Sequence, residues 1–149
     1  MKLSPRKLIQ QLTADTTALA MREGRRVGQP GHEKALRYLT QRLAELNLTP
    51  WKGGQFALTY ELPHPKTKKR QAFTNLIAVI PGKDRSLPPL LLGAHYDSVI
   101  DAPCADDNAT SVALNLAIAE EFAGGKLERD LIIAFFDAEE PPHFLGKTM

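Results

Sequence analysis

Cysteine and net charge are both scarce in this sequence, and each shortage excludes something. The only cysteine is Cys104, so the chain forms no intrachain disulfide and nothing in it demands an oxidising compartment. A formal net charge of +2 is too small to indicate nucleic acid or an anionic membrane as a partner.

Long apolar stretches are also missing. The N-terminal residues 1–7 are not followed by the apolar segment of roughly 7–15 residues that a secretory signal needs. The apolar runs also fall well short of the about 20 residues that cross a bilayer. We therefore expect a cytoplasmic protein without a membrane partner, although a leader that had been removed would leave the same sequence.

The 149 residues are enough for one domain, 1–149, with a buried core. Ser4-Pro5 predicts a helix start, with Ser4 as the N-cap, and leucines at helical spacing continue this helix as far as Gly24. Glycines and a proline over 24–31 predict a loop. A second helix is predicted over 31–46, because four leucines fall on one face: Leu36, Leu39, Leu43 and Leu46.

A basic run over 63–70 separates two strand-like segments, 55–62 and 72–80. One interpretation of this run is a patch that binds nucleic acid or a partner. The run is short and has no interleaved aromatic residues, so a solvated hairpin loop is the favoured interpretation.

Two short apolar runs, 90–94 and 131–136, are typical of strands buried on both faces. Between them, residues 109–122 predict a helix that Gly124-Gly125 ends. The order helix, helix, strand, strand, strand, helix, strand predicts an α/β fold. Its sheet is expected to be mixed, mostly parallel and sandwiched between helices.

Acidic and histidine side chains gather next to the ends of the two apolar strands. One pair follows the first strand, a second pair follows the second strand, and two aspartates open the helix between them. If the strands are parallel neighbours joined by that helix, all six side chains meet at the carboxyl edge of the sheet, where open α/β sheets place their sites. The six residues are His95, Asp97, Asp106, Asp107, Glu139 and Glu140.

These residue types suit zinc, which binds imidazole and carboxylate ligands. An aspartate between two ions can bridge them. Two zinc ions about 3.5–4 Å apart can hold a hydroxide and polarise a carbonyl, which is the chemistry of peptide hydrolysis without a covalent intermediate. The adjacent Glu139 and Glu140 point different ways, so one can bind metal while the other takes a proton from water.

Each segment also has a purely structural interpretation. His95-Tyr96-Asp97 can be an ordinary surface pair, and Asp106-Asp107-Asn108 is a good helix N-cap and dipole partner. Glu139-Glu140 can be a solvated strand end. The joint placement after two buried strands is what favours a metal or catalytic site.

Three motifs resemble those of the two-zinc exopeptidases of the bacterial leucyl aminopeptidase type, to which glutamate carboxypeptidase and glutaminyl cyclase are related. They are Gly93-Ala94-His95-Tyr96-Asp97-Ser98, Ala105-Asp106-Asp107-Asn108-Ala109, and Phe135-Phe136-Asp137-Ala138-Glu139-Glu140. Their order and approximate spacing agree with that family, and residues 25–48 are similar to its lead-in helix. The resemblance implies the phosphorylase/hydrolase-like fold of zinc exopeptidases, two zinc ions per complete site and a peptide substrate.

The resemblance also implies a role for each residue. His95 would bind one zinc, Glu140 the other, and Asp107 would bridge both. Glu139 would be the general base, and Asp97 would orient His95 through a hydrogen bond. Asp106 would have no direct metal role.

This sequence departs from the family pattern at three places beside these motifs, one of them Thr110-Ser111, near which the family usually has a Ser-Gly pair. Cys104 stands where the family usually has glycine; a zinc thiolate is one interpretation, and a small buried thiol is the favoured one. Pro141-Pro142-His143 replaces the usual Gly-Leu, and His143 is expected to be a loop residue rather than a ligand.

The family uses two further metal ligands, an aspartate and a histidine, that would lie beyond Met149. We therefore expect the N-terminal part of one catalytic domain, with a sheet that is incomplete at its C-terminal side and weak or absent turnover. Two alternatives remain at this point: an acyltransferase like glutaminyl cyclase, and a non-catalytic fragment. The oligomeric state stays open.

Overall fold

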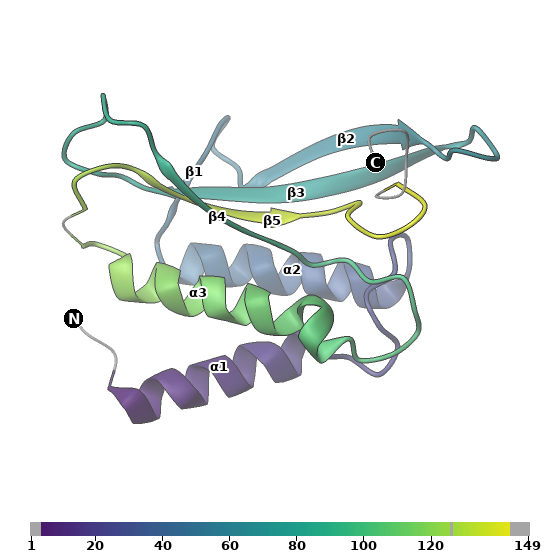
Figure 1. Ribbon diagram of the computed structural model, residues 1–149, viewed down its shortest axis with the longest axis horizontal. Helices are drawn as coiled ribbons and strands as arrows, with labels where there is room; N and C mark the ends of the chain where they lie inside the picture. The colour runs from purple at the N-terminus through teal and green to yellow at the C-terminus, as the bar shows by residue number, and fades with distance from the viewer. Residues whose placement is uncertain (1–3, 126, 144–149) are drawn as a thin grey trace.

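The computed structural model describes residues 4–125 and 127–143, which form a sheet with helices against it (Figure 1). In chain order the elements are α1 (Pro5–Leu19), α2 (Pro30–Glu45), β1 (Thr49–Pro50), β2 (Ala57–Pro63), β3 (Arg70–Ile80), β4 (Leu90–His95), the π-helical turn η1 (Ala105–Ala109), α3 (Thr110–Phe122) and β5 (Leu131–Phe136). The predicted order is therefore confirmed, with β1 and η1 as additions. The C-terminal residues 146–149, on which the prediction of an early chain end rests, lie outside the described residues.

The sheet is mixed, as predicted, with strand order β1-β3-β5-β4 and β2 also paired to β3. The prediction that it is mostly parallel is wrong for the described strands. Strand β3 pairs antiparallel with β1, β2 and β5, and only β4 and β5 are parallel. A short hairpin joins β2 to β3 and forces the antiparallel arrangement, whereas the β4–α3–β5 crossover is long enough to bring the next strand back in the same direction.

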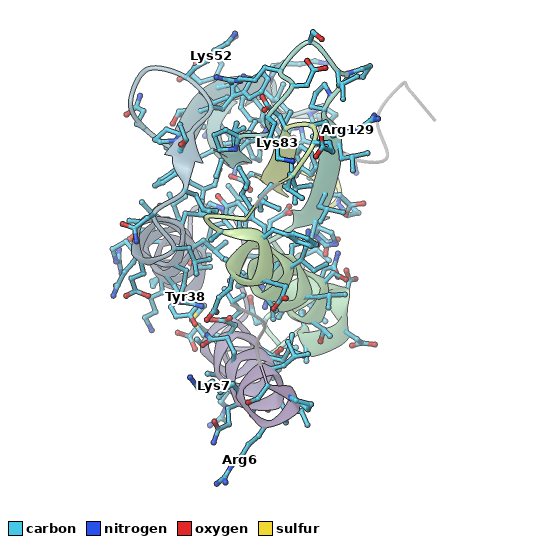
Figure 2. The ribbon with its side chains drawn as sticks, turned by 90° about the vertical axis from the view of Figure 1, so that its left-hand side faces the viewer. Arg6, Lys7, Tyr38, Lys52, Lys83 and Arg129 are labelled. Atoms are coloured by element: carbon cyan, nitrogen blue, oxygen red, sulfur yellow. The ribbon has the colours of Figure 1, made fainter. Side chains whose placement is uncertain are left out.

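The described helices all lie on one face of the sheet, rather than on both faces as predicted (Figure 1). Seen end-on, the sheet, the pair α2 and α3, and finally α1 form successive layers (Figure 2). Because α1 packs against α3 and α2, it reaches the sheet only through them.

Regular spacing of small and branched apolar side chains builds the core between the sheet and the helices. On α2, Ala35, Leu39 and Leu43 are fully buried at every fourth position, which places them on one stripe. Alternate residues of β3 and β5 face that stripe, because side chains on a strand alternate between its two faces. These residues are Leu76, Ala78 and Ile80 on β3 and Leu131, Ile133 and Phe135 on β5.

Local signals fixed several boundaries. Ser4 caps α1 by accepting a hydrogen bond from the Lys7 amide, as predicted, although the helix ends at Leu19 rather than near Gly24. The basic run forms a hairpin loop closed by hydrogen bonds between His64 and Lys69 and between Lys68 and His64. This confirms the solvated-loop interpretation for that run.

Candidate metal centre

Strands β4 and β5 are parallel neighbours joined by α3, with His95 paired to Phe136 at the ends of the two strands. This confirms the arrangement on which the predicted site depends. His95 is the last residue of β4, Glu139 and Glu140 follow β5, and Asp107 lies in η1 immediately before α3. The ends of three segments that are distant in sequence thus meet at one edge of the sheet.

The side chains of His95, Asp107 and Glu140 converge there. One ligand atom from each lies within 4.8 Å of the other two. Nε2 of His95 is 3.0 Å from Oδ1 of Asp107 and 3.7 Å from Oε2 of Glu139. Asp106 is exposed and does not join this group of three. The three residues brought together are those that the sequence predicted as metal ligands.

Asp97 is 1% exposed and lies next to both His95 and the loop that carries Glu140. Its Oδ1 lies 3.4 Å from Nδ1 of His95, and both atoms are buried without a hydrogen-bond partner among the described residues. Its Oδ2 accepts a hydrogen bond from the Glu140 amide at 3.1 Å. One buried carboxylate therefore lies next to the imidazole of His95 and accepts a hydrogen bond from the backbone of Glu140.

Electrostatics in the cluster favour protonation of its histidine and of one glutamate. Burial alone would lower the pKa of His95, but the carboxylates of Asp97, Glu139 and Asp107 outweigh it and raise that pKa. Burial and the neighbouring Asp107 and Asp97 carboxylates raise the pKa of Glu140. Excess negative charge at such a cluster is relieved either by protons or by a cation, and the two compete.

The turn η1 presents Asp107 through an irregular backbone path. Cys104 is in the left-handed region at φ 45°, and Asp107 and Asn108 leave helical geometry, with a cis peptide bond between them. The hydroxyl of Thr110 donates to the Ala105 carbonyl at 2.7 Å and closes the turn. Cys104 is half-buried, against the buried thiol predicted, and it is not part of the three-residue cluster.

The loop after β5 is anchored by Asp137, a residue to which the sequence analysis assigns no role. Its Oδ1 is 3.1 Å from Nε2 of the buried His32 on α2, its Oδ2 accepts from the Thr74 amide at 2.8 Å, and the Tyr96 hydroxyl lies 3.3 Å from that Oδ2. The ring of Tyr96 stacks on that of His32. These contacts fix the backbone just before Glu139 and Glu140. Asp137 lies in the third of the three sequence motifs. Its partners His32 and Thr74 belong to α2 and β3, which are distant in sequence, so no local pattern predicts these contacts.

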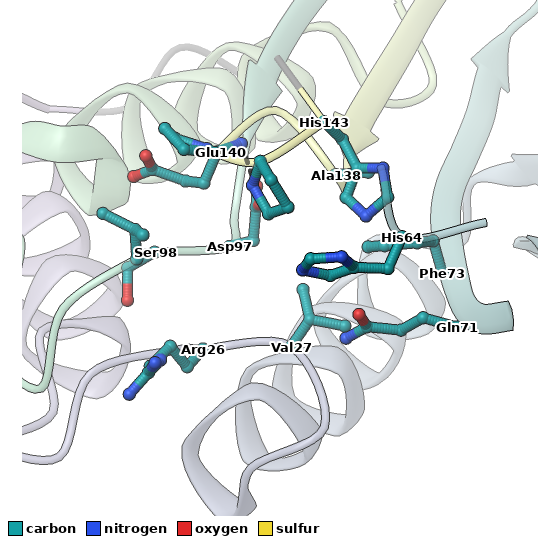
Figure 3. A pocket seen from close by; sticks show the side chains of 13 residues that line it. Arg26, Val27, His64, Gln71, Phe73, Asp97, Ser98, Ala138, Glu140 and His143 are labelled. Carbon is teal, nitrogen blue, oxygen red and sulfur yellow. Dashed lines mark hydrogen bonds between the residues drawn. The ribbon is translucent and has the colours of Figure 1, made fainter. Parts of the chain in front are cut away.

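A pocket of about 190 Å³ opens beside the cluster, and Asp97 and Glu140 form part of its wall (Figure 3). His64, Phe73 and His143 line the other side. The rings of Phe73 and His143 meet edge to face at 4.8 Å between centroids, and burial together with His64 lowers the pKa of His143. His143, predicted as a loop residue, therefore faces a cavity that adjoins the candidate centre.

The residues fit a zinc ion. The donor set is one imidazole nitrogen and carboxylate oxygens, which zinc prefers. Nε2 of His95 is left to face oxygen atoms because Asp97 lies at Nδ1. The group is also open to solvent on one side, since the Asp107 side chain is 71% exposed.

Comparison with known proteins agrees with this assignment at the level of class. The model of peptidase family M28 matches residues 75–146, a stretch that contains every predicted site residue. The vacuolar membrane protease of Schizosaccharomyces japonicus is 42% identical over 78 residues, which are 51% of this chain and 9% of that protein. The protein of the same name from Schizosaccharomyces pombe is 42% identical over 74 residues, 50% of this chain and 9% of its own length. These matches support a metal-dependent peptidase.

The names of these relatives contradict the predicted cytoplasmic location, since they point to a vacuolar membrane. The prediction was wrong because it relied on the lack of a leader or anchor in a chain that spans only about a tenth of the length of these relatives. Among the described residues, no helix is both long and apolar enough to cross a membrane.

Solved structures show the fold. Glutaminyl cyclase of Fimbriiglobus ruber matches with a TM-score of 0.74 at 21% identity, over 94% of this chain and 48% of that one. A Zn-dependent exopeptidase from Parabacteroides distasonis matches with a TM-score of 0.69 at 21% identity, over 87% of this chain and 46% of that one. The zinc exopeptidase fold is thus confirmed, and the sheet described here is incomplete beside those chains. At such identity the likeness to cyclases carries no function, and the cyclase alternative is not favoured beside the peptidase matches.

Proposed function

We propose that this chain carries the metal-binding part of a zinc-dependent aminopeptidase of the M28 type. One observation carries the proposal: ligand atoms of His95, Asp107 and Glu140, from three separate segments, lie within 4.8 Å of one another at the carboxyl edge of a parallel strand pair. The family match over the same residues supports it.

In the proposed centre His95 would hold one zinc ion, Glu140 would hold a second, and Asp107 would contribute to both. When bound, zinc supplies Lewis-acid polarisation of the scissile carbonyl and lowers the pKa of water. Asp97 keeps the imidazole of His95 oriented with Nε2 free, because its own oxygen lies at Nδ1.

Glu139 is proposed as the general base. Its carboxylate lies beside the cluster, 3.7 Å from Nε2 of His95, and its side chain is 38% exposed, so water can reach it. In the proposed reaction it takes the proton of the attacking water and later delivers it to the leaving amine.

The proposed substrate is a peptide with a free N-terminus. The pocket beside Glu140 offers aromatic and imidazole walls close to the cluster, which suits a substrate side chain next to the bond that is cleaved.

The test combines metal binding and hydrolysis in the purified protein. With zinc added, release of nitroaniline from leucyl p-nitroanilide should be abolished by a chelator and restored by zinc. Glu139→Gln should keep zinc binding and lose hydrolysis by roughly 10²–10⁴-fold. Glu128→Gln is the matched control, since it makes the same chemical change at an exposed ion pair with Lys83 away from the cluster, and it should behave as the wild type.

Three other results would reverse the proposal. Hydrolysis that persists after chelation would exclude a metal peptidase. Release of ammonia from a glutaminyl peptide, with no peptide bond cleaved, would indicate a cyclase. A purified protein that binds no zinc would indicate a non-catalytic chain.

A further inference from the structure

Arg25, in the loop between α1 and α2, is a fully buried cation. It is 0% exposed. Burial lowers its pKa, and no carboxylate is hydrogen-bonded to it among the described residues. A buried cation is costly unless its donors are satisfied, so the acceptors of Arg25 decide what it does.

All five N–H groups of the guanidinium have a backbone carbonyl acceptor. Nε donates to Tyr96 at 2.7 Å. Nη1 donates to Leu19 at 2.8 Å and to Pro103 at 2.9 Å. Nη2 donates to Cys104 at 3.1 Å and to Asp107 at 3.2 Å. An arginine has five donors in a fixed plane, so this set uses its full capacity.

Four of the five acceptors belong to the two ends of the connection between β4 and α3, the His95 loop (residues 96–98) and the Asp107 loop (residues 103–108). Tyr96 directly follows His95, and Asp107 is itself one of the three converging residues. The α1 carbonyl of Leu19 supplies the fixed point, because it is the end of a regular helix. A single rigid plane thus connects the backbone beside His95, the backbone of Asp107 and the helix layer.

The backbone of Arg25 reinforces the first of these loops. Its amide donates to Oγ of Ser98 at 2.7 Å, and its carbonyl accepts from the Ser98 amide at 3.2 Å. The β4 loop is therefore held at residue 96 by the side chain and at residue 98 by the main chain. Between these two points lies Asp97, which orients His95.

We propose that Arg25 is a positioning residue for the metal centre: its guanidinium sets the separation between the His95 loop and the Asp107 loop. The backbone of η1 leaves helical geometry at Asp107 and Asn108, and Arg25 supplies a donor to the Asp107 carbonyl from outside the turn. The inference rests on the proposed function for the metal itself, but the clamp on the loops exists without metal.

The experiment compares Arg25→Met and Arg25→Lys with Arg42→Met in the purified protein. Met has neither charge nor donors, and Lys keeps the charge but supplies only three donors in another geometry. Arg42 is the matched control, because it is also largely buried but donates to carboxylates within the helix layer. Two quantities are measured: hydrogen exchange of residues 95–98 and 104–108 in metal-free protein, and zinc affinity by competition with a chromophoric chelator.

Both Arg25 variants should exchange faster in the two loops and bind zinc roughly 10- to 100-fold more weakly, the usual cost of losing an outer-shell partner. Arg42→Met should change neither quantity in the folded protein. Cobalt substituted for zinc should give an altered absorption spectrum in Arg25→Lys, because coordination geometry changes even though charge is kept.

Wild-type exchange and affinity in either folded Arg25 variant would overturn the inference. A wild-type protein that binds no zinc would overturn the proposed function instead, and loop exchange would still decide the role of Arg25. If neither variant folds, the guanidinium resonances of Arg25 in the wild type decide. Slow solvent exchange and a shift on zinc addition support the clamp, and fast exchange with no shift excludes it.

Discussion

Two largely buried arginines in this molecule are held by different kinds of acceptor. Arg25 donates only to backbone carbonyls, most of them in irregular loops. Arg42, on α2, donates to carboxylates of Asp15, Glu45 and Glu120, which come from helices. The helix backbone is already satisfied and needs no outside donor, whereas the loop backbone does. Arg25 therefore determines the path of the ligand loops, and Arg42 compensates a buried charge between helices.

The largest effect should come from the helix layer and should leave the metal centre intact. Asp15 is 0% exposed and holds Arg42 at 3.0 Å; the Tyr38 hydroxyl also donates to it. Asp15→Ala removes the buried acceptor of the Tyr38 hydroxyl and leaves Arg42 only its more exposed partners Glu45 and Glu120, so the free energy of unfolding should fall by about 3 kcal/mol in urea denaturation. Zinc affinity of the folded protein should not change.

Glu45→Ala is the control for that prediction, because Glu45 pairs with the same arginine but its side chain is 46% exposed. It should have little effect, since exposed ion pairs contribute little. Equal losses in Asp15→Ala and Glu45→Ala would remove the distinction between buried and exposed partners of Arg42.

The second largest effect is expected on zinc affinity, through a substitution at the metal centre. Asp97→Asn replaces a carboxylate whose two oxygens face Nδ1 of His95 and the Glu140 amide with a side chain that has one oxygen, so one of these two groups then faces an NH₂ group. Zinc affinity should fall roughly 10- to 100-fold, measured by chelator competition. Asp101→Asn, on the same loop and 71% exposed, should bind zinc as the wild type does. If the two variants bind equally well, Asp97 does not orient the ligand.

Sequence reasoning found the metal cluster but not the residues that hold it. Buried strands, the helix between them and the acids at their ends are local patterns, so His95, Asp107 and Glu140 could be placed at one edge of a sheet. Arg25 could not be found in this way. Arg25 and Arg26 are adjacent and alike, yet one is 0% exposed and the other has a side chain that is 52% exposed. Only the folded loops, about 70–80 residues further along, distinguish them.

The same limit applies to the sheet. The apolar runs predicted strands, and the β4–α3–β5 crossover predicted their one parallel pair. The antiparallel pairing of β3 with β5 is a long-range contact with no local signal. The prediction of a mostly parallel sheet was therefore wrong. The contacts of Asp137 also lack a local signal, because its partners His32 and Thr74 lie on other elements.

Zinc affinity and the stability of the metal-free fold should change in opposite directions with pH. The pKa of His95 is raised, although burial opposes it, because the carboxylates around it outweigh burial. Zinc needs the neutral imidazole, so affinity should fall by about tenfold per pH unit as pH drops through that raised pKa. Metal-free stability moves the other way. The contribution of a raised histidine pKa is fully present below the unfolded value of about 6.5 and is lost as pH rises through the folded value.

Zinc titrations and urea denaturation between about pH 5 and pH 8 test this opposition. His64→Ala is the control, because its imidazole lies outside the cluster. If zinc affinity and the contribution of His95 to metal-free stability change in the same direction with pH, His95 is not the titrating ligand.

The smallest predicted effect concerns Tyr96, which contacts both Arg25 and Asp137. Its carbonyl accepts from Arg25, and its hydroxyl donates to the Thr74 carbonyl at 2.8 Å and lies 3.3 Å from Oδ2 of Asp137. Tyr96→Phe keeps the ring and the Arg25 contact but removes the hydroxyl, so the free energy of unfolding should fall by about 1 kcal/mol. If the carbonyl clamp is what positions the ligands, zinc affinity in Tyr96→Phe should stay close to that of the wild type. A loss as large as that in Arg25→Met would instead place the control of the metal centre in the hydroxyl network around Asp137.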